Sequence, residues 1–345
     1  MSTTFQIRGA GAAAPVFIAD HNETLLQAGL RQAAPLDYLC GSGGCGSCEA
    51  RLLQGTVCLA AEEGSPLVVG QEGEAAPRVL LCQSRPRTDC VLQLRLAAAL
   101  PQAATPSQLP ATLSDIRPLG GDLYQVTLAL PRTLPYLAGQ YLMVQAPGLP
   151  GQRAYSIAGV DPDTGRVRLI VAQRGEGCFS RWLTDPAHVG QALLAFGPMG
   201  RASLAPRPEQ DTVVIAGGSG ISVGLAALQW AASERFLARR RMWLFWGVRD
   251  AGQVPALTGE LAARQRGQAG LHIAVCSDAA PPAQALGVAC EQGYPVDRLT
   301  AREDIDWTAA AVYVTGPPAM VAHTLRTLLT QTDIEPDAIS SDNFY

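Results

Sequence analysis

Residues 40–48, CGSGGCGSC, constrain this chain more than any other stretch. Cys40, Cys45 and Cys48 stand among four glycines, and a fourth cysteine, Cys82, follows in the segment LLCQS. The spacing C-x4-C-x2-C with one distant cysteine is the ligand pattern of a plant-type 2Fe-2S cluster. Glycine tolerates positive φ, so such a loop can wrap a cluster while its N–H groups point at the sulfurs. We therefore predict that these four cysteines hold a 2Fe-2S cluster.

The structural alternative for this cysteine set is a zinc site. Structural zinc sites usually pair their ligands in two short C-x2-C hooks, whereas Cys82 stands alone. The other five of the nine cysteines are scattered singly, and each is expected to be a small buried residue. The N-terminus lacks the layout of a secretion signal, which predicts a cytoplasmic protein with reduced thiols.

Charge and composition exclude several functions. All 26 basic residues are arginine, so a P-loop lysine and a Schiff-base lysine are both absent. The net charge is −4 with no basic patch, which disfavours nucleic-acid binding. The uncharged run at residues 212–233 is long enough to suggest a membrane span, but its glycines favour a buried strand, a turn and a helix. We expect neither a nucleic acid nor a membrane as a partner.

Sequence patterns divide the chain into three domains, a multidomain α+β and α/β architecture. Residues 1–97 contain short strands and one helix near residues 24–33, and residues 98–110, rich in Ala, Pro and Gln, are typical of a linker. Residues 111–208 contain strand-like runs separated by Gly and Pro, which predict an antiparallel barrel. Residues 209–345 alternate apolar strands, glycine turns and helices, which predicts a parallel sheet.

The barrel region carries two segments suited to a flavin, RAYSIAG and RGEGCFSRWL. In the first, Arg153 can clamp a phosphate, Tyr155 can stack on a planar ring and Ser156 can supply a hydrogen bond. In the second, residues 175–180 open a predicted helix whose free N–H groups favour an anion.

The parallel-sheet region is suited to a dinucleotide. Ligands of such sheets bind at the carboxyl ends of the strands, where the turns GGSG and TGPP fall, although the G-x-G-x-x-G fingerprint is absent. Asp278 follows the third strand, where its charge would repel a 2′-phosphate. We therefore predict NADH over NADPH, with Arg249 as the contrary indication.

With these motifs in place, the chain resembles the reductase components of bacterial ring-hydroxylating (Rieske) oxygenases, of the naphthalene and carbazole dioxygenase type, over nearly its whole length. The resemblance implies a β-grasp 2Fe-2S ferredoxin domain, an antiparallel β-barrel FAD domain and a Rossmann-like NAD domain. It also implies an electron route from NADH through FAD and the cluster to an oxygenase. NADH gives up two electrons together and a cluster accepts one, so a flavin is needed between them.

The resemblance assigns roles residue by residue. R-x-Y-S implies pyrophosphate contact by Arg153, ring stacking by Tyr155 and a hydroxyl near flavin N5 from Ser156. The acidic-x-aromatic ending falls on Asp342 and Phe344. The resemblance implies that the Phe344 ring lies on the flavin and moves away when nicotinamide binds, which a free tail at residues 343–345 would allow. The residues expected to contact cofactors are Arg153, Ala154, Tyr155, Ser156, Val171, Gly177, Cys178, Ser180, Gly218, Ser219, Gly220, Arg249, Asp278, Gly316, Pro317 and Phe344. Those expected to act in catalysis are Ser156, Thr315 and Phe344.

Two positions depart from the family pattern. Thr315 precedes Gly316 where relatives commonly have cysteine, which puts the speed of hydride transfer in doubt. Ser222-Val223 replaces a common Ala-Pro after the glycine loop.

Other functions remain open from sequence alone. The acceptor is expected to be a Rieske oxygenase or an intermediary ferredoxin, but a di-iron monooxygenase or a deoxysugar-forming dehydratase would accept electrons from the same module. A non-catalytic redox sensor is a further alternative. Residues 220–224 satisfy G-x-S-x-G, so a serine hydrolase is also considered. A nucleophile elbow would follow its strand more directly, and the simpler expectation is that Ser222 is a helix N-cap.

Overall fold

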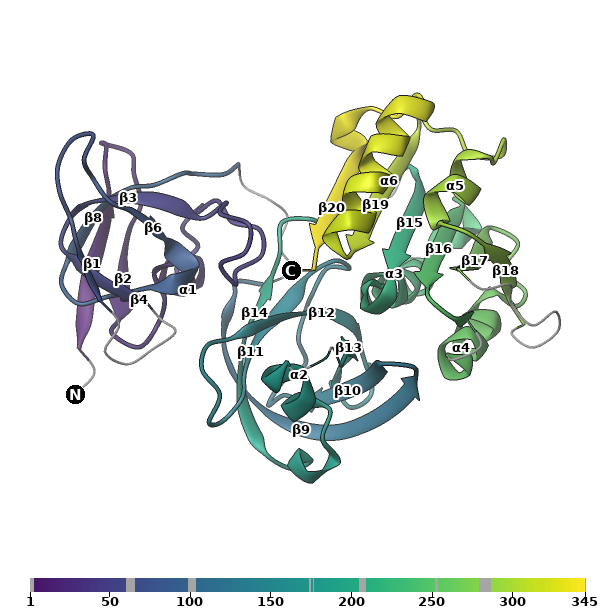
Figure 1. Cartoon of the computed structure of the whole chain (residues 1–345), viewed down its shortest axis with the longest axis horizontal. Helices are drawn as coiled ribbons and strands as arrows, with labels where there is room; N and C mark the ends of the chain where they lie inside the picture. Colours follow the sequence, from purple (N-terminus) through teal and green to yellow (C-terminus); the bar gives the residue numbers. More distant parts are fainter. Residues whose placement is uncertain are drawn as a thin grey trace. The chain divides into compact units, whose positions relative to one another are not determined.

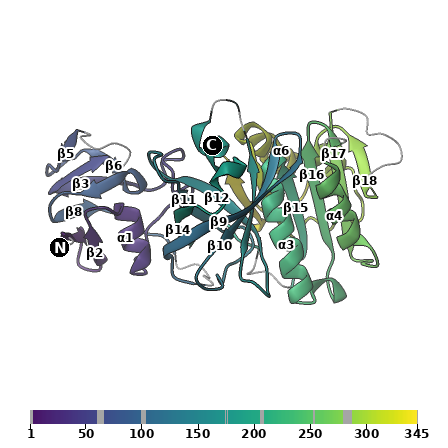
Figure 2. The same ribbon diagram turned by 90° about the horizontal axis from the view of Figure 1, so that it is seen from below.

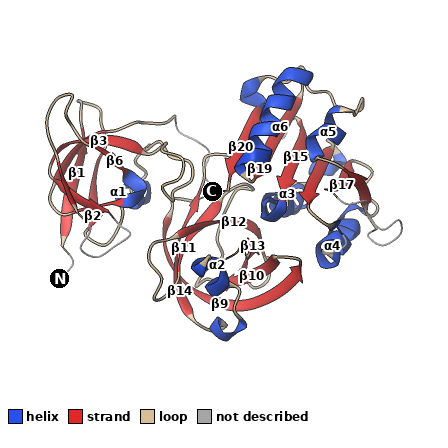
Figure 3. Ribbon diagram, in the orientation of Figure 1, coloured by secondary structure: helices blue, strands red, loops and turns tan. Residues whose placement is uncertain are grey.

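The computed structural model of the chain describes residues 3–59, 66–98, 104–173, 175, 177–204, 209–251, 254–278 and 287–344. Figure 1 labels its elements along the chain. By its internal contacts the chain forms two compact units. The first contains residues 1–110, 141–154 and 193–201, and the second contains the rest. Strands dominate the first two domains, and helices accompany the strands of the third (Figure 3).

The N-terminal domain is the predicted β-grasp fold. Its main sheet has five strands in the order β2-β1-β8-β3-β6, in which β1 and β8 run parallel and the other neighbours run antiparallel. A second sheet has the order β5-β4-β7. The elements are β1 (Thr4–Gly9), β2 (Val16–Asp20), α1 (Leu25–Arg31), β3 (Glu49–Gln54), β4 (Thr56–Leu59), β5 (Leu67–Val69), β6 (Arg78–Leu80), β7 (Ser84–Pro86) and β8 (Cys90–Gln93).

The helix predicted for residues 24–33 is confirmed as α1. It begins at a capping box in which Thr24 Oγ1 accepts from the Gln27 N–H and the Gln27 side chain accepts from the Thr24 N–H. Leu25, Leu26 and Leu30 are buried in the domain core. The cap and this apolar face together place α1 directly before the cysteine loop.

The second domain is a closed antiparallel barrel with the strand order β10-β13-β12-β11-β14-β9. The predicted linker is too long, because β9 begins within it at Ser107 and Leu109 is buried as a strand residue. Residues 99–103 of that stretch lie outside the described residues. The elements are β9 (Ser107–Gly120), β10 (Leu123–Ala129), β11 (Tyr141–Gln145), β12 (Arg153–Val160), β13 (Val167–Ala172), α2 (Cys178–Leu183) and β14 (Ala192–Met199).

The third domain is a six-stranded parallel sheet in the order β18-β17-β16-β15-β19-β20. Helices cover both faces: one buried core joins the sheet to α3 and α4, and another joins it to α5 and α6. Figure 2 shows α3 and α4 in front of the strands. The elements are β15 (Asp211–Gly217), α3 (Ile221–Ser233), β16 (Met242–Val248), α4 (Pro255–Gln265), β17 (Leu271–Ser277), β18 (Ala289–Gln292), α5 (Pro295–Thr300), β19 (Ala310–Gly316), α6 (Pro318–Gln331) and β20 (Ile339–Asn343).

The expectation of a free C-terminal tail is wrong for Asn343 and for the backbone of Phe344. Asn343 ends β20, which pairs with β19 at Gly316. The Phe344 N–H then donates to the Gly316 carbonyl at 2.9 Å. The edge of β19 offers unpaired backbone groups, and the tail satisfies them. Tyr345 lies outside the described residues.

None of the described helices is long and apolar enough to cross a membrane. The uncharged run at residues 212–233 forms β15, a glycine turn and α3, as predicted.

Gln229 of α3 fastens the parallel-sheet domain to the barrel within the second unit. Its side-chain carbonyl accepts from the Val160 N–H at 3.0 Å, and its amide donates to the Val160 carbonyl at 2.6 Å. Tyr136 donates its hydroxyl to the same side-chain oxygen at 3.1 Å. A second link is the bidentate pair between Arg168 and Glu260, at 2.9 and 2.7 Å.

We predict that Gln229→Ala destabilises the protein by about 2 kcal/mol, because it leaves both backbone groups of Val160 without partners. Urea unfolding followed by tryptophan fluorescence measures the change. Gln331→Ala, at the exposed end of α6, is the matched control and should stay within about 0.5 kcal/mol of wild type. Equal stability of the two variants would contradict the role given to Gln229.

Candidate functional site

The four cysteines of the predicted cluster site lie close together in two pairs. Cys48 Sγ is 3.3 Å from Cys82 Sγ, and the Cys40 N–H lies 3.5 Å from Cys45 Sγ. The loop between α1 and β3 supplies three of the cysteines, and a 3-10 turn between β6 and β7 supplies Cys82. Cys40, Cys48 and Cys82 are buried, whereas Cys45 is half-buried. The structure therefore brings the four predicted cysteines together, and their role as cluster ligands stays a prediction.

The glycines of the loop do what their type suggests. Gly41, Gly43 and Gly46 have φ values of 64°, 92° and 74°, a region that side chains rarely adopt. The left-handed turn at Gly41 lets the Ser42 N–H approach Cys40 Sγ to 3.4 Å. Backbone N–H groups thus face sulfur, as a cluster loop requires.

Each cysteine pair contains one thiol that loses its proton readily. The hydrogen bond from Cys40 lowers the pKa of Cys45 to about 4, and the same bond raises the pKa of Cys40 to about 12. The hydrogen bond with Cys82 lowers the pKa of Cys48, while it raises that of Cys82. Thiolates are the form that binds metal, so a cluster on these residues would require all four thiols to lose their protons.

The two metal hypotheses require different arrangements of the four sulfurs. A four-thiolate zinc site requires all four sulfurs around one ion. A 2Fe-2S cluster shares four thiolates between two irons, two on each. The arrangement in two cysteine pairs fits the sharing of four thiolates between two irons.

The predicted flavin residues lie on β12 and α2. The rings of Tyr155 and Phe179 stack with centroids 6.1 Å apart and planes at 28°. Arg153 is exposed and donates to the Gln152 carbonyl at 2.9 Å, whereas Ser156 is buried. Nothing in the sequence indicated that Phe179 contacts Tyr155.

The other predicted flavin contacts occupy neighbouring positions. Gly177 is the N-cap of α2, and the Ser180 hydroxyl donates to its carbonyl at 3.2 Å. Ala154 and Cys178 are exposed, and Val171 is buried on β13. Their contacts with FAD stay predictions.

A cleft of about 960 Å³ opens at the carboxyl ends of the parallel strands, inside the second unit. Trp246 Nε1 donates to the Gly218 carbonyl at 2.9 Å and so fixes one wall of this cleft. Its lining contains five of the predicted coenzyme contacts, namely Gly218, Ser219, Arg249, Asp278 and Pro317. Asp122, Asp250, Tyr294 and Met320 also line it and were not predicted.

Three predicted residues lie behind the lining rather than in it. A Cβ on Gly220 would stand 2.8 Å from the Thr315 carbonyl, and one on Gly316 would stand 3.1 Å from Gly217 Cα, so both glycines permit close backbone packing. Thr315 is fully buried, and its hydroxyl has no hydrogen-bond partner among the described residues. Contact between Thr315 and a nicotinamide stays a prediction.

Arg249, the contrary indication for coenzyme choice, pairs with a carboxylate of the barrel. Its Nη2 lies 3.2 Å from Asp122 Oδ2, and its side chain is 86% exposed. Among the described lining residues, the charged side chains are the guanidinium of Arg249 and the carboxylates of Asp122, Asp250 and Asp278.

The expectation that Ser222 is a helix N-cap is wrong. Ser222 lies inside α3, whose N-cap is Gly220. Its hydroxyl is buried and donates to the Ser219 carbonyl at 3.0 Å. A nucleophilic serine must reach its substrate, and this one faces backbone. The geometry gives no support to a hydrolase.

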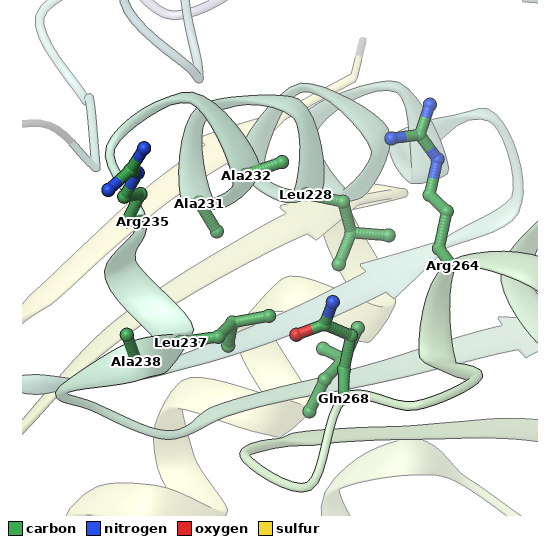
Figure 4. Close-up of a pocket in the computed structure, with 9 residues that line it drawn as sticks. Leu228, Ala231, Ala232, Arg235, Leu237, Ala238, Arg264 and Gln268 are labelled. Atoms are coloured by element: carbon green, nitrogen blue, oxygen red, sulfur yellow. The ribbon is translucent and has the colours of Figure 1, made fainter.

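A second cavity, of about 420 Å³, lies between the end of α3 and α4 (Figure 4). Figure 4 shows Leu228, Leu237 and Gln268 around its space, with Arg235 and Arg264 at its two ends. None of the predicted cofactor residues lines it. The larger cleft thus contains the predicted coenzyme contacts, and coenzyme binding there stays a prediction.

Comparison with known proteins agrees with this architecture. Residues 14–87 match the family described as the 2Fe-2S iron-sulfur cluster binding domain, and residues 110–204 match the oxidoreductase FAD-binding domain. An iron-sulfur domain joined to a flavin barrel and a parallel-sheet domain defines an electron-transfer flavoprotein reductase.

Full-length relatives narrow the class. The chain is 31% identical over 328 residues to the ferredoxin–NAD(+) reductase component of an alkene monooxygenase system from Xanthobacter autotrophicus, covering 95% of this chain and 97% of the relative. It is 28% identical to the reductase component of phenol 2-monooxygenase from a Pseudomonas species, covering 96% and 92%. The solved ferredoxin reductase of carbazole 1,9a-dioxygenase superposes with a TM-score of 0.81 at 25% identity, covering 100% of this chain and 99% of that one.

The chain belongs to the family of reductase components of oxygenase systems. It is an oxidoreductase with a 2Fe-2S domain and an FAD domain that transfers electrons toward an oxygenase. The predicted family, fold and general function are confirmed.

We predict that Cys82→Ser abolishes the cluster but leaves the flavin in place, because it removes one thiolate from the Cys48–Cys82 pair. Iron analysis and the visible spectrum of the purified variant measure this. Cys290→Ser, in the third domain, is the matched control and should keep wild-type iron. Full iron content in Cys82→Ser would refute the assignment.

Proposed function

We propose that this chain carries electrons from NADH through FAD to a 2Fe-2S cluster on Cys40, Cys45, Cys48 and Cys82, and from there to a terminal oxygenase or its ferredoxin. The observation that carries the proposal is the arrangement of these cysteines as two thiol pairs. We place its domains at residues 1–97, 107–208 and 209–345, since β9 begins at Ser107, and reduced thiols fit a cytoplasmic location.

The flavin accepts two electrons as hydride and releases them singly when bound in such a protein. In this proposal the protein's residues bind and orient it. Arg153 supplies a fixed positive charge for the pyrophosphate, and Tyr155, stacked on Phe179, offers an aromatic face to the ring. Ser156 would supply a hydroxyl group to the flavin, and Phe344 would supply an aromatic ring to cover it.

The cleft supports NADH rather than NADPH as the donor. The carboxylates of Asp122, Asp250 and Asp278 disfavour an additional phosphate, and Arg249, the cation among the described lining residues, is already paired with Asp122. A 2′-phosphate would have to displace Asp122 and approach Asp278 as well. Like charges placed this close cost binding free energy in partly desolvated sites.

We predict a kcat/KM for NADH at least about tenfold above that for NADPH, since tenfold corresponds to only about 1.4 kcal/mol. Asp278→Asn should narrow this ratio by raising kcat/KM for NADPH. Steady-state assays of both coenzymes with ferricyanide as acceptor measure it. A wild-type preference for NADPH would overturn the proposal for the donor.

We propose that the electron acceptor is a Rieske-type oxygenase, which acts on an aromatic substrate. The similarity to the carbazole 1,9a-dioxygenase reductase over the whole chain supports it. A monooxygenase is the second candidate, supported by the similarity to reductase components of alkene and phenol monooxygenases. Reconstituted turnover with purified oxygenases of each class distinguishes them, because only the true partner should couple NADH oxidation to product.

The direct test of the electron route is anaerobic addition of NADH to the purified protein. Loss of the flavin absorption bands and a rhombic 2Fe-2S EPR signal are expected together. Rapid turnover with cytochrome c would separate a reductase from a redox sensor. Flavin reduction without any cluster signal would contradict the proposed route.

A further inference from the structure

Two buried tyrosines join the cysteine loop to the flavin barrel within the first compact unit. Tyr141, the first residue of β11, donates its hydroxyl to the Leu39 carbonyl at 2.6 Å. In the opposite direction, Tyr38 accepts from the Gly200 N–H, just after β14, at 3.1 Å. Tyr38 is 2% exposed and Tyr141 is 4% exposed. We call this reciprocal pair, Tyr38 and Tyr141, the tyrosine clasp.

The tyrosine clasp contacts the loop next to its first cysteine, Cys40. Gly41, directly after Cys40, lies so close to the barrel that an added Cβ would stand 3.1 Å from the Tyr141 hydroxyl. The same Cβ would be 3.2 Å from both Met143 Sδ and Met199 Cε. The glycine therefore serves contact with the barrel as well as the turn at positive φ.

Further contacts support the same junction. Asp37 pairs with Arg201 at 3.6 Å, and Gln27 donates to the Gln152 side chain at 2.8 Å. Met143 and Met199 are buried in one apolar core with residues of the ferredoxin domain. A junction with buried hydrogen bonds, an ion pair and shared apolar packing is specific rather than incidental.

One predicted flavin residue belongs to the same compact unit as this junction. Arg153, the first residue of β12, lies in the first unit together with Tyr38 and Tyr141. The unit that holds the cysteine loop thus also contains a residue expected to contact the flavin.

We propose that Tyr38 and Tyr141 are positioning residues for electron transfer, which hold the Leu39–Gly41 segment on the barrel so that electrons enter the cluster at the Cys40 side of the loop. The inference rests on the proposed cofactor assignment. Neither tyrosine touches a reacting atom; each acts through the backbone of the loop. The hydroxyl groups alone carry the role, since the rings would remain buried without them.

The test uses full-length holoprotein with Tyr38→Phe, Tyr141→Phe and the double variant. Stopped-flow absorbance after mixing with NADH separates the rate of flavin reduction from the rate of cluster reduction, and EPR records the g values of the reduced cluster. Tyr124→Phe, a half-buried tyrosine on β10, is the matched control. Iron and flavin contents are measured for every variant.

Flavin reduction should stay at the wild-type rate in all variants. Each clasp variant should slow cluster reduction about threefold to tenfold, the range that one lost hydrogen bond gives, and should shift the EPR g values. The double variant should be slower still. Loss of cluster iron from the clasp variants alone, with flavin retained, would also support a positioning role.

Wild-type cluster reduction and unchanged g values in the double variant would overturn the inference, whatever its thermal stability. This failure differs from failure of the proposed function. In the latter case the wild-type protein itself would lack iron, flavin or NADH-driven cluster reduction.

Discussion

The pairing of four thiols in two couples is the constraint on which the rest of the structure depends. Thiolates repel one another, so they stay together only where hydrogen bonds and metal offset that repulsion. Cys40 and Cys45 come from a loop, and Cys48 meets Cys82 across the domain at 3.3 Å. Such closeness requires a backbone that turns tightly without side chains in the way. The glycines of the loop and the capped helix before it meet that requirement.

In the two domains that follow, the predicted binding residues lie at the ends of strands. The predicted flavin residues begin β12, and the cleft opens where the parallel strands end. Hydrogen bonds from side chain to backbone connect the parts inside each unit. Gln229 binds Val160 in the second unit, and the tyrosine clasp binds the cysteine loop in the first. Each connection satisfies buried polar groups, which makes it costly to open.

Local signals in the sequence were enough to predict that the four cysteines come together, and to predict α1, the barrel and most of the parallel sheet. Their physical causes are local too: ligand spacing, a capping box and strand periodicity. The failures came from long-range contacts. Nothing near Tyr38 indicates that it meets Gly200, and nothing in the tail shows that Asn343 extends a sheet. The motif around Thr315 also gave no sign of its full burial, which depends on neighbouring strands.

X-ray absorption at the iron edge of the oxidised, purified protein tests the central claim most directly. If two cysteine pairs each hold one iron, every iron should be surrounded by sulfur and should have a second iron in the next shell. A single metal ion bound to all four sulfurs, whether iron or zinc, would contradict the account.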